Sequence, residues 1–141
     1  MPFQTGDADI VEELRHLGLF AKLENADLRQ IADLGEPVDA EAGAVLMDQG
    51  DVGTECFLVL QGEASVRAAG EHVATVGPGT IVGEMALVGH RPRTASVVAE
   101  TPMRLLAFDI EAFRRLLDQL PQARTFVLEV LEARAAANRR A

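Results

Sequence analysis

The chain has one cysteine, a deficit of positive charge and no long apolar run. The single cysteine, Cys56, excludes an internal disulfide, and its apolar neighbours indicate a buried, inert thiol. No apolar stretch approaches the roughly 20 residues that a bilayer-spanning helix needs. The acidic N-terminus also lacks the layout of a signal peptide. We therefore expect a cytoplasmic protein that does not enter a membrane.

The shortage of basic residues constrains the partners. The formal net charge is −9, from 13 basic and 22 acidic side chains. Generic nucleic-acid binding depends on basic patches that displace counterions, so this balance argues against a nucleic-acid partner. An anionic ligand would also be repelled at long range. Its site would have to rely on local donors, such as one arginine and oriented backbone amides.

The residue patterns of common enzymes are missing. The three histidines fall on an expected helix, a strand edge and a loop, without the spacing of a metal-binding jelly-roll enzyme. A serine-nucleophile motif is absent. Segment 77–83 is rich in glycine, but Gly89 and Pro92 interrupt the long helix that a dinucleotide-binding fold requires next. We expect no catalytic activity, no metal and no cofactor.

Length and patterning fit one domain of 141 residues, large enough to bury a hydrophobic core. We expect N-terminal helices over 1–35, a β-roll over 36–109 and C-terminal helices over 110–141. In the middle part, short apolar segments alternate with turns, which is typical of an antiparallel barrel or jelly roll. The expected strands are 45–47, 56–60, 64–68, 72–76, 94–99 and 103–108.

Apolar residues at helical spacing and capping residues locate the helices. Asn25 is expected to cap the second helix and Gly35 to end it. Asp109 is expected to cap the third helix, and Pro121 ends it or starts the next one. The first helical segment carries Ile10, Leu14 and Leu17 after the start residues Asp7 and Asp9, and the second runs from Asn25 or Ala26 to Leu34. The third carries Ile110, Phe113, Leu116 and Leu117, and the last covers about 122–138.

The strongest functional signal is Gly-Glu-Met-Ala-Leu at 83–87, followed by Pro-Arg-Thr-Ala-Ser-Val at 92–97. It places the carboxylate of Glu84 and the guanidinium of Arg93 nine residues apart, around a short helical turn and a loop. The free N–H groups of the turn and the arginine can hold an anion. The carboxylate can accept hydroxyl protons. The pattern indicates a site for a small anion that carries neighbouring hydroxyl groups.

This stretch resembles the phosphate-binding cassette of the cyclic-nucleotide-binding domains. Those domains occur in the catabolite activator protein, in regulatory subunits of cyclic-AMP-dependent kinase and in cyclic-nucleotide-gated channels. Segments 49–51, 57–62 and 76–79 also stand in the family's order, and the resemblance covers roughly 17–130. It implies an antiparallel β-roll with flanking helices that binds cyclic AMP ahead of cyclic GMP. Val82 replaces the family's usual aromatic residue, so we expect altered packing with intact binding.

The resemblance implies a role for each cassette residue. Glu84 would accept a hydrogen bond from the ribose 2′-OH, and Arg93, rather than Arg91, would bind the cyclic phosphate. Gly83 would let the backbone approach the phosphate and adopt conformations closed to other residues. Outside this context, Glu84 reads as a helix-cap carboxylate and Arg93 as a surface arginine.

The other cassette residues supply amides, a hydroxyl group and space. The amides of Met85 and Ala86 would point at the phosphate oxygens. Thr94 would bond the phosphate or the guanine 2-amino group, so it does not settle the base. Ala95 would keep the pocket floor small, and its amide would add a contact.

The resemblance also implies a base pocket. Val66 and Val73 would line the purine, although both fit equally well as ordinary core residues. Arg134 and Asn138 lie four residues apart and share a helix face, where they would close over the base. A solvated helix end explains that pair equally well.

The expected function is that of a stand-alone sensing domain without an output module. Its C-terminal helices would rearrange and signal to a separate effector protein, or to a second copy in a homodimer through the helix that carries Phe126, Val130 and Leu131. The alternative is a protein-interaction module of the same fold without a cyclic nucleotide. Glu84 and Arg93 favour the sensing function.

Overall fold

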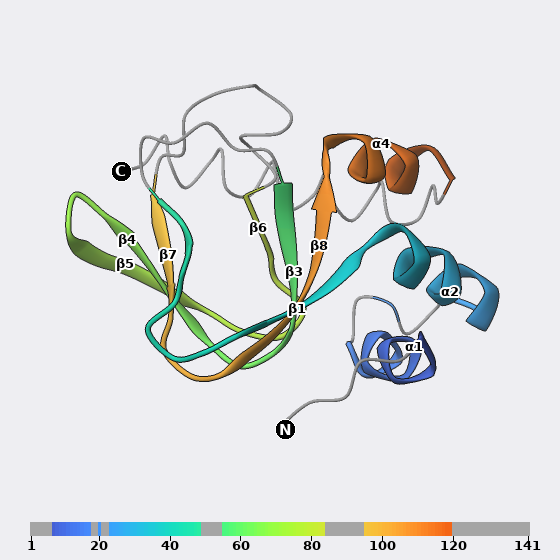
Figure 1. Cartoon of the computed structure of the whole chain (residues 1–141), viewed down its shortest axis with the longest axis horizontal. Helices are drawn as coiled ribbons and strands as arrows, with labels where there is room; N and C mark the ends of the chain where they lie inside the picture. The colour runs from blue at the N-terminus through green and yellow to red at the C-terminus, as the bar shows by residue number, and fades with distance from the viewer. Residues whose placement is uncertain (1–6, 18–19, 21–22, 49–54, 84–94, 120–141) are drawn as a thin grey trace.

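Two four-stranded antiparallel sheets face each other, and helices cover the outer side of one sheet (Figure 1). The structure is a computed structural model that describes residues 7–17, 20, 23–48, 55–83 and 95–119. The predicted antiparallel β-roll with flanking helices is confirmed. Its described helices are α1 (Asp7–His16), α2 (Asn25–Leu34) and α4 (Ile110–Gln119). Its described strands are β1 (Glu36–Ala40), β2 (Val45–Met47), β3 (Glu55–Gln61), β4 (Ala64–Ala68), β5 (Glu71–Val76), β6 (Ile81–Val82), β7 (Ser96–Ala99) and β8 (Met103–Asp109).

The first sheet has the strand order β1-β8-β3-β6, and the second has the order β2-β7-β4-β5. The bounds of β2 and β4 equal the predicted ones. Strands β5 and β8 are one residue longer than predicted at one end, and β3 is one residue longer at both ends. Strand β7 begins at Ser96, whereas its predicted start at Thr94 lies outside the described residues. Strands β1 and β6 were not predicted, because β1 contains Pro37 and β6 has only two residues.

The first sheet is covered on both faces, so its central strands β3 and β8 are mostly apolar. In β3, the side chains of Cys56, Leu58 and Leu60 pack against the helices. The alternate residues Phe57 and Val59 face the interior of the roll. Strand alternation therefore places one row in each cluster. Cys56 is fully buried, which confirms the burial predicted from the sequence.

The second sheet contributes one face to the roll interior. Ala64, Val97 and Ala99 belong to the interior cluster together with residues of the first sheet. Val45 on β2 and Val73 on β5 are instead exposed, at 59% and 62%. Strands β2 and β5 are the edges of this sheet, and they are more exposed than the central strands β3 and β8 of the first sheet.

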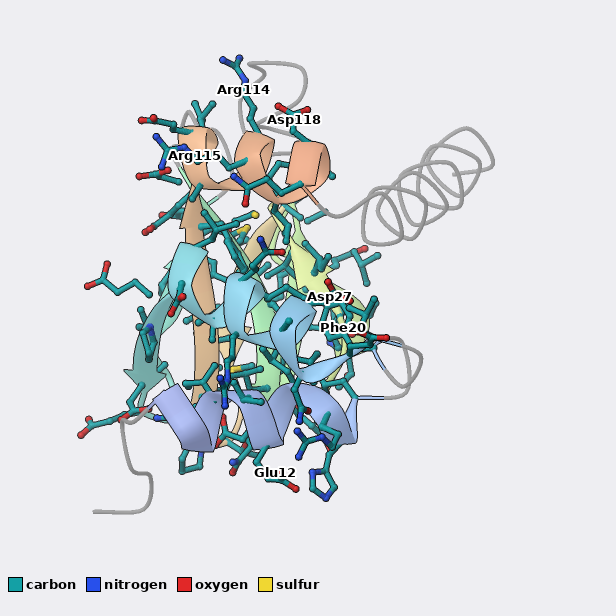
Figure 2. The ribbon with its side chains drawn as sticks, turned by 90° about the vertical axis from the view of Figure 1, so that its right-hand side faces the viewer. Glu12, Phe20, Asp27, Arg114, Arg115 and Asp118 are labelled. Atoms are coloured by element: carbon teal, nitrogen blue, oxygen red, sulfur yellow. The ribbon has the colours of Figure 1, made fainter. Side chains whose placement is uncertain are left out.

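Helices α1, α2 and α4 stack over the outer face of the first sheet, as Figure 2 shows from the helix side. Their buried residues form one cluster with the outward residues of β3 and β8. The side chain of Phe20, in the connection after α1, is also buried there. None of the helices in the described ranges has the length and apolar character to cross a membrane.

Local contacts set the helix ends. The predicted cap role of Asn25 is wrong, because α2 already begins there and Glu24 is its N-cap. The backbone N–H of Glu24 donates to Asp27 Oδ2 at 3.3 Å, which fixes this earlier start. Asp109 does cap α4, since its Oδ1 accepts a 2.7 Å hydrogen bond from the N–H of Ala112.

Gly35 ends α2, as predicted, but by close packing and not by a left-handed turn. Its φ is −94°, and its N–H donates to Ile31 O at 3.1 Å. A Cβ atom at this position would lie 2.9 Å from the Cδ atoms of Leu106. The absence of a side chain therefore lets the chain pass directly over β8.

A buried ionic network joins α1 to the first sheet. Arg104 on β8 has a side chain with 0% exposure and lies in register between Asp39 of β1 and Gln61 of β3. Its Nε donates to Glu13 Oε2 of α1 at 2.9 Å, and its Nη1 donates to Asp39 Oδ1 at 3.2 Å. Gln61 Nε2 donates to the other oxygen of Glu13 at 2.9 Å. One helix is thereby connected to three strands.

The register shift in β3 makes this network possible. Val59 pairs with Leu105 and Gln61 pairs with Arg104, so Leu60 is an extra residue on β3. Leu60 and Gln61 consequently both reach the helix side, which simple alternation would forbid. The sequence signal for the network is the arginine inside the apolar run of β8, although its partners are distant in the sequence.

Glu13 and Glu12 offer a matched test, because they are neighbours on α1 with different surroundings. Glu13→Ala leaves a buried guanidinium with Asp39 as its one remaining carboxylate among the described residues. We expect the free energy of unfolding to fall by about 2–4 kcal/mol, below the usual cost of breaking a buried pair because Asp39 remains. Among the described residues, Glu12 makes exposed ion pairs with Arg15 and His16. Glu12→Ala should therefore change the free energy of unfolding by less than about 1 kcal/mol. Urea denaturation measures both values, and equal effects would contradict the importance of the network.

Candidate functional site

The described residues include both ends of the cassette and two residues of the expected base pocket. Gly83, Ala95, Val66 and Val73 are described. The final helix predicted over 122–138 lies outside the described residues, so its existence stays a prediction. The roles of the other candidate residues stay predictions for the same reason, and these residues are Glu84, Met85, Ala86, Arg93, Thr94, Arg134 and Asn138.

The first end of the cassette, at Gly83, follows β6 on the first sheet. Residues Ile81 and Val82 of β6 pair with β3 and are buried. The turn before β6 is held to β3 by two backbone hydrogen bonds, from Val59 N to Thr80 O at 2.9 Å and from Gly79 N to Val59 O at 2.8 Å. The backbone therefore reaches Gly83 from a firmly paired strand.

Gly83 has a φ of +90°, in the left-handed region that side chains disfavour. The backbone leaves β6 in a direction that most other residues would adopt only with strain. Glu84 is the next residue in the sequence. The backbone conformation therefore explains why a glycine precedes Glu84, whichever ligand the segment binds.

The second end of the cassette, at Ala95, precedes β7 on the second sheet. Ala95 is half-buried, and Ser96 begins the strand. The Ser96 hydroxyl donates to Asp48 Oδ1 at 2.8 Å, while Ser96 pairs with Arg67 of β4 on the other side. Neighbours on both sides thus hold this end.

The two ends belong to different sheets but lie at the same end of the roll, the upper end in Figure 1. Glu84 directly follows one end, and Thr94 directly precedes the other. The fold therefore brings the start and the finish of the predicted cassette to one end of the molecule. Sequence spacing alone could not establish this proximity.

The position of Val66 fits both of its predicted roles, as a wall of the purine pocket and as an ordinary core residue. It is half-buried and packs against the interior cluster of the roll. In register it lies between Val97 of β7 and Ala74 of β5. Its side chain therefore faces the space between the sheets, where core residues and pocket walls are both apolar.

Val73 has different surroundings from Val66. Val66 pairs with Ala74, whereas Arg67 pairs with His72, so Val73 is an extra residue at a register shift of β5. It is 62% exposed, and the described residues packed against the interior cluster include Val66 but not Val73. Period-two alternation does not determine side-chain direction at such a shift.

Polar groups on the outer side of β4 and β5 satisfy one another. The buried hydroxyl of Ser65 lies 2.8 Å from His72 Nδ1, and Thr75 Oγ1 lies 3.4 Å from His72 Nε2. His72 therefore acts as a hydrogen-bond partner within the sheet. No group of three or more His, Cys, Asp and Glu residues in the described part of the chain is arranged to hold a metal ion.

Comparison with known proteins places these features in a family. The sequence model of the cyclic nucleotide-binding domain matches residues 37–120. The cAMP-dependent protein kinase regulatory subunit of Schizosaccharomyces pombe is 35% identical over 105 residues, which cover 74% of this chain and 26% of that protein. A cyclic nucleotide-gated potassium channel of Rhizobium etli is 37% identical over 117 residues, which cover 82% of this chain and 33% of that protein.

Solved structures agree with the sequence matches. The crystal structure of the catabolite activator protein of Thermus thermophilus superposes with a TM-score of 0.76 at 28% identity, covering 85% of this chain and 59% of that one. The chain spans about a quarter to a third of the length of the two curated relatives described above. The similarity therefore concerns one domain of those larger proteins.

Proposed function

The chain belongs to the cyclic nucleotide-binding domain family, as its sequence resemblance predicted, and we propose that it is a cyclic nucleotide sensor that prefers cyclic AMP to cyclic GMP. The observation that carries the proposal is the presence of Glu84 and Arg93 in a cassette sequence whose two ends lie at one end of the roll. Arg93 binds the cyclic phosphate, and Glu84 accepts a hydrogen bond from the ribose 2′-OH.

Electrostatics favours a specific site over a diffuse one. The protein carries a formal charge of −9, which repels a phosphate at long range. Binding must therefore come from short-range donors, and Arg93 supplies a charge-assisted hydrogen bond. The amides of Met85 and Ala86 supply neutral donors, as in other anion sites at the start of a helical turn.

Fewer observations support the preference for cyclic AMP over cyclic GMP than support the binding of a cyclic nucleotide. The kinase regulatory subunit that is 35% identical is cAMP-dependent by name. Thr94 is compatible with either purine, and Val66 provides an apolar contact that both bases accept. Arg134 or Asn138, the proposed lid over the base, would add selectivity.

The proposed signal is a rearrangement of the C-terminal helices. Helix α4 follows β8 directly and packs against α2, β3 and β8. Strand β3 in turn pairs with β6, which leads to Gly83. A ligand that prefers one helix arrangement shifts the population toward it, and an effector protein or a second copy of the chain would read the change.

A ligand panel tests the proposed function. Isothermal titration calorimetry suits this chain, which has no tryptophan or tyrosine to report binding. We expect cyclic AMP to bind more tightly than cyclic GMP, and the linear 5′-monophosphates to bind at least about tenfold more weakly because they lack the cyclic phosphodiester. Binding of neither cyclic nucleotide would favour the interaction module of the same fold.

Arg93 should carry much of the phosphate binding. We expect Arg93→Ala to weaken cyclic AMP binding at least tenfold, since losing one partner of a desolvated charge pair costs about 2–5 kcal/mol. Arg114→Ala is the control, because Arg114 is exposed on α4 (Figure 2). The dissociation constant measures both, and an unchanged value in Arg93→Ala would refute the assignment.

Glu84 should determine the preference for the ribose sugar. The neutral side chain in Glu84→Gln is a weaker acceptor for the 2′-OH, so the preference for cyclic AMP over 2′-deoxy cyclic AMP should decrease. The ratio of the two dissociation constants measures this effect. Arg93→Ala should leave the ratio unchanged, and a constant ratio in Glu84→Gln would mean that the carboxylate is structural.

A further inference from the structure

A side-chain hydrogen bond lies beside the second end of the cassette. Ser96 Oγ donates to Asp48 Oδ1 at 2.8 Å. Ser96 is the first residue of β7 and directly follows Ala95, a predicted site residue. Asp48 directly follows β2 and is distant from the cassette in the sequence.

The strand register shows what this bond adds. The last backbone pair between β2 and β7 is Met47 with Val97, after a register shift between Val45 and Met47. The bond from Ser96 to Asp48 continues the connection one residue beyond that pair. On the opposite side, Ser96 remains paired with Arg67 of β4. The start of β7 is therefore held by both neighbouring strands.

We propose that Asp48 is a positioning residue for the nucleotide site, and this inference rests on the proposed function. By holding the Ser96 side chain, Asp48 fixes the start of β7 and the adjacent Ala95, a predicted site residue. A site residue that is held in place before binding loses less conformational freedom when the ligand binds, so the affinity rises. In this role Asp48 acts through Ser96 and not through a contact with the nucleotide.

The charge of Asp48 allows its two possible effects to be separated. As a negative charge near the cassette, it would lower the affinity for an anion, and its removal would strengthen binding. As a hydrogen-bond acceptor for Ser96, it raises the affinity, and its removal weakens binding. Asp48→Asn removes the charge but keeps an acceptor oxygen, whereas Asp48→Ala removes both.

The experiment is a double-mutant cycle on cyclic AMP binding, measured by calorimetry. Ser96→Ala and Asp48→Ala should each weaken binding about three- to tenfold, the range expected for one hydrogen bond. The double variant should be little weaker than either single variant, since both remove the same bond. Ser96→Thr and Asp48→Asn keep the bond and should stay within about twofold of the wild type. The control, Glu111→Ala, removes an exposed 2.8 Å bond to Arg115 on α4 and should have no effect.

Two further readouts distinguish positioning from general destabilisation. The thermal unfolding midpoints of the variants should stay close to that of the wild type. The preference for cyclic AMP over its 2′-deoxy analogue should also stay constant, because Glu84 is unaffected. A wild-type protein that binds no cyclic nucleotide would overturn the proposed function and this inference together. Two results would overturn the positioning role alone, provided that the wild type binds. One is an unchanged affinity in both alanine variants. The other is a loss of affinity in the double variant that equals the product of the two single losses.

Discussion

The buried guanidinium of Arg104 organises the scaffold of this domain. Burial of a charge is expensive unless partners surround it, and Arg104 obtains its partners from α1 and from the strand on one side of it. Those partners can meet only when the first sheet has its observed register and α1 lies across its outer face. The same sheet carries β6, which leads to Gly83. The ionic network and the start of the cassette therefore depend on one set of strand pairings.

The two sheets differ in which of their faces are packed against other elements. The first sheet contacts helices on one side and the roll interior on the other, so it forms a rigid centre. The second sheet contributes only its inner face to the core, and its edges carry register shifts near Val45 and Val73. The cassette begins on the rigid sheet and ends on the more exposed one. The hydrogen bond between Ser96 and Asp48 lies at this second end.

The comparisons are consistent with a module that serves different outputs. A kinase regulatory subunit and a potassium channel contain regions more than 30% identical to this chain, although their names describe unlike activities. The common element is the domain that the family model matches over 37–120. A net charge of −9 further restricts how such a domain can bind an anion, because attraction must come from groups within a few ångströms of the phosphate.

The sequence by itself determined the family, the antiparallel roll, the helical segments that are described and the approximate positions of six of the eight described strands, because period-two alternation, turn residues and caps are local signals. It could not locate β1 or β6, since one contains a proline and the other is too short for a pattern. It assigned the cap of α2 to Asn25, one residue after the true N-cap Glu24, because both types occur near helix starts. The cassette motif in the sequence also predicted that Glu84 and Arg93 bind the ligand. Only the tertiary structure showed that Arg104 meets Glu13 and that Ser96 meets Asp48, because both contacts join residues far apart in the chain and depend on strand register.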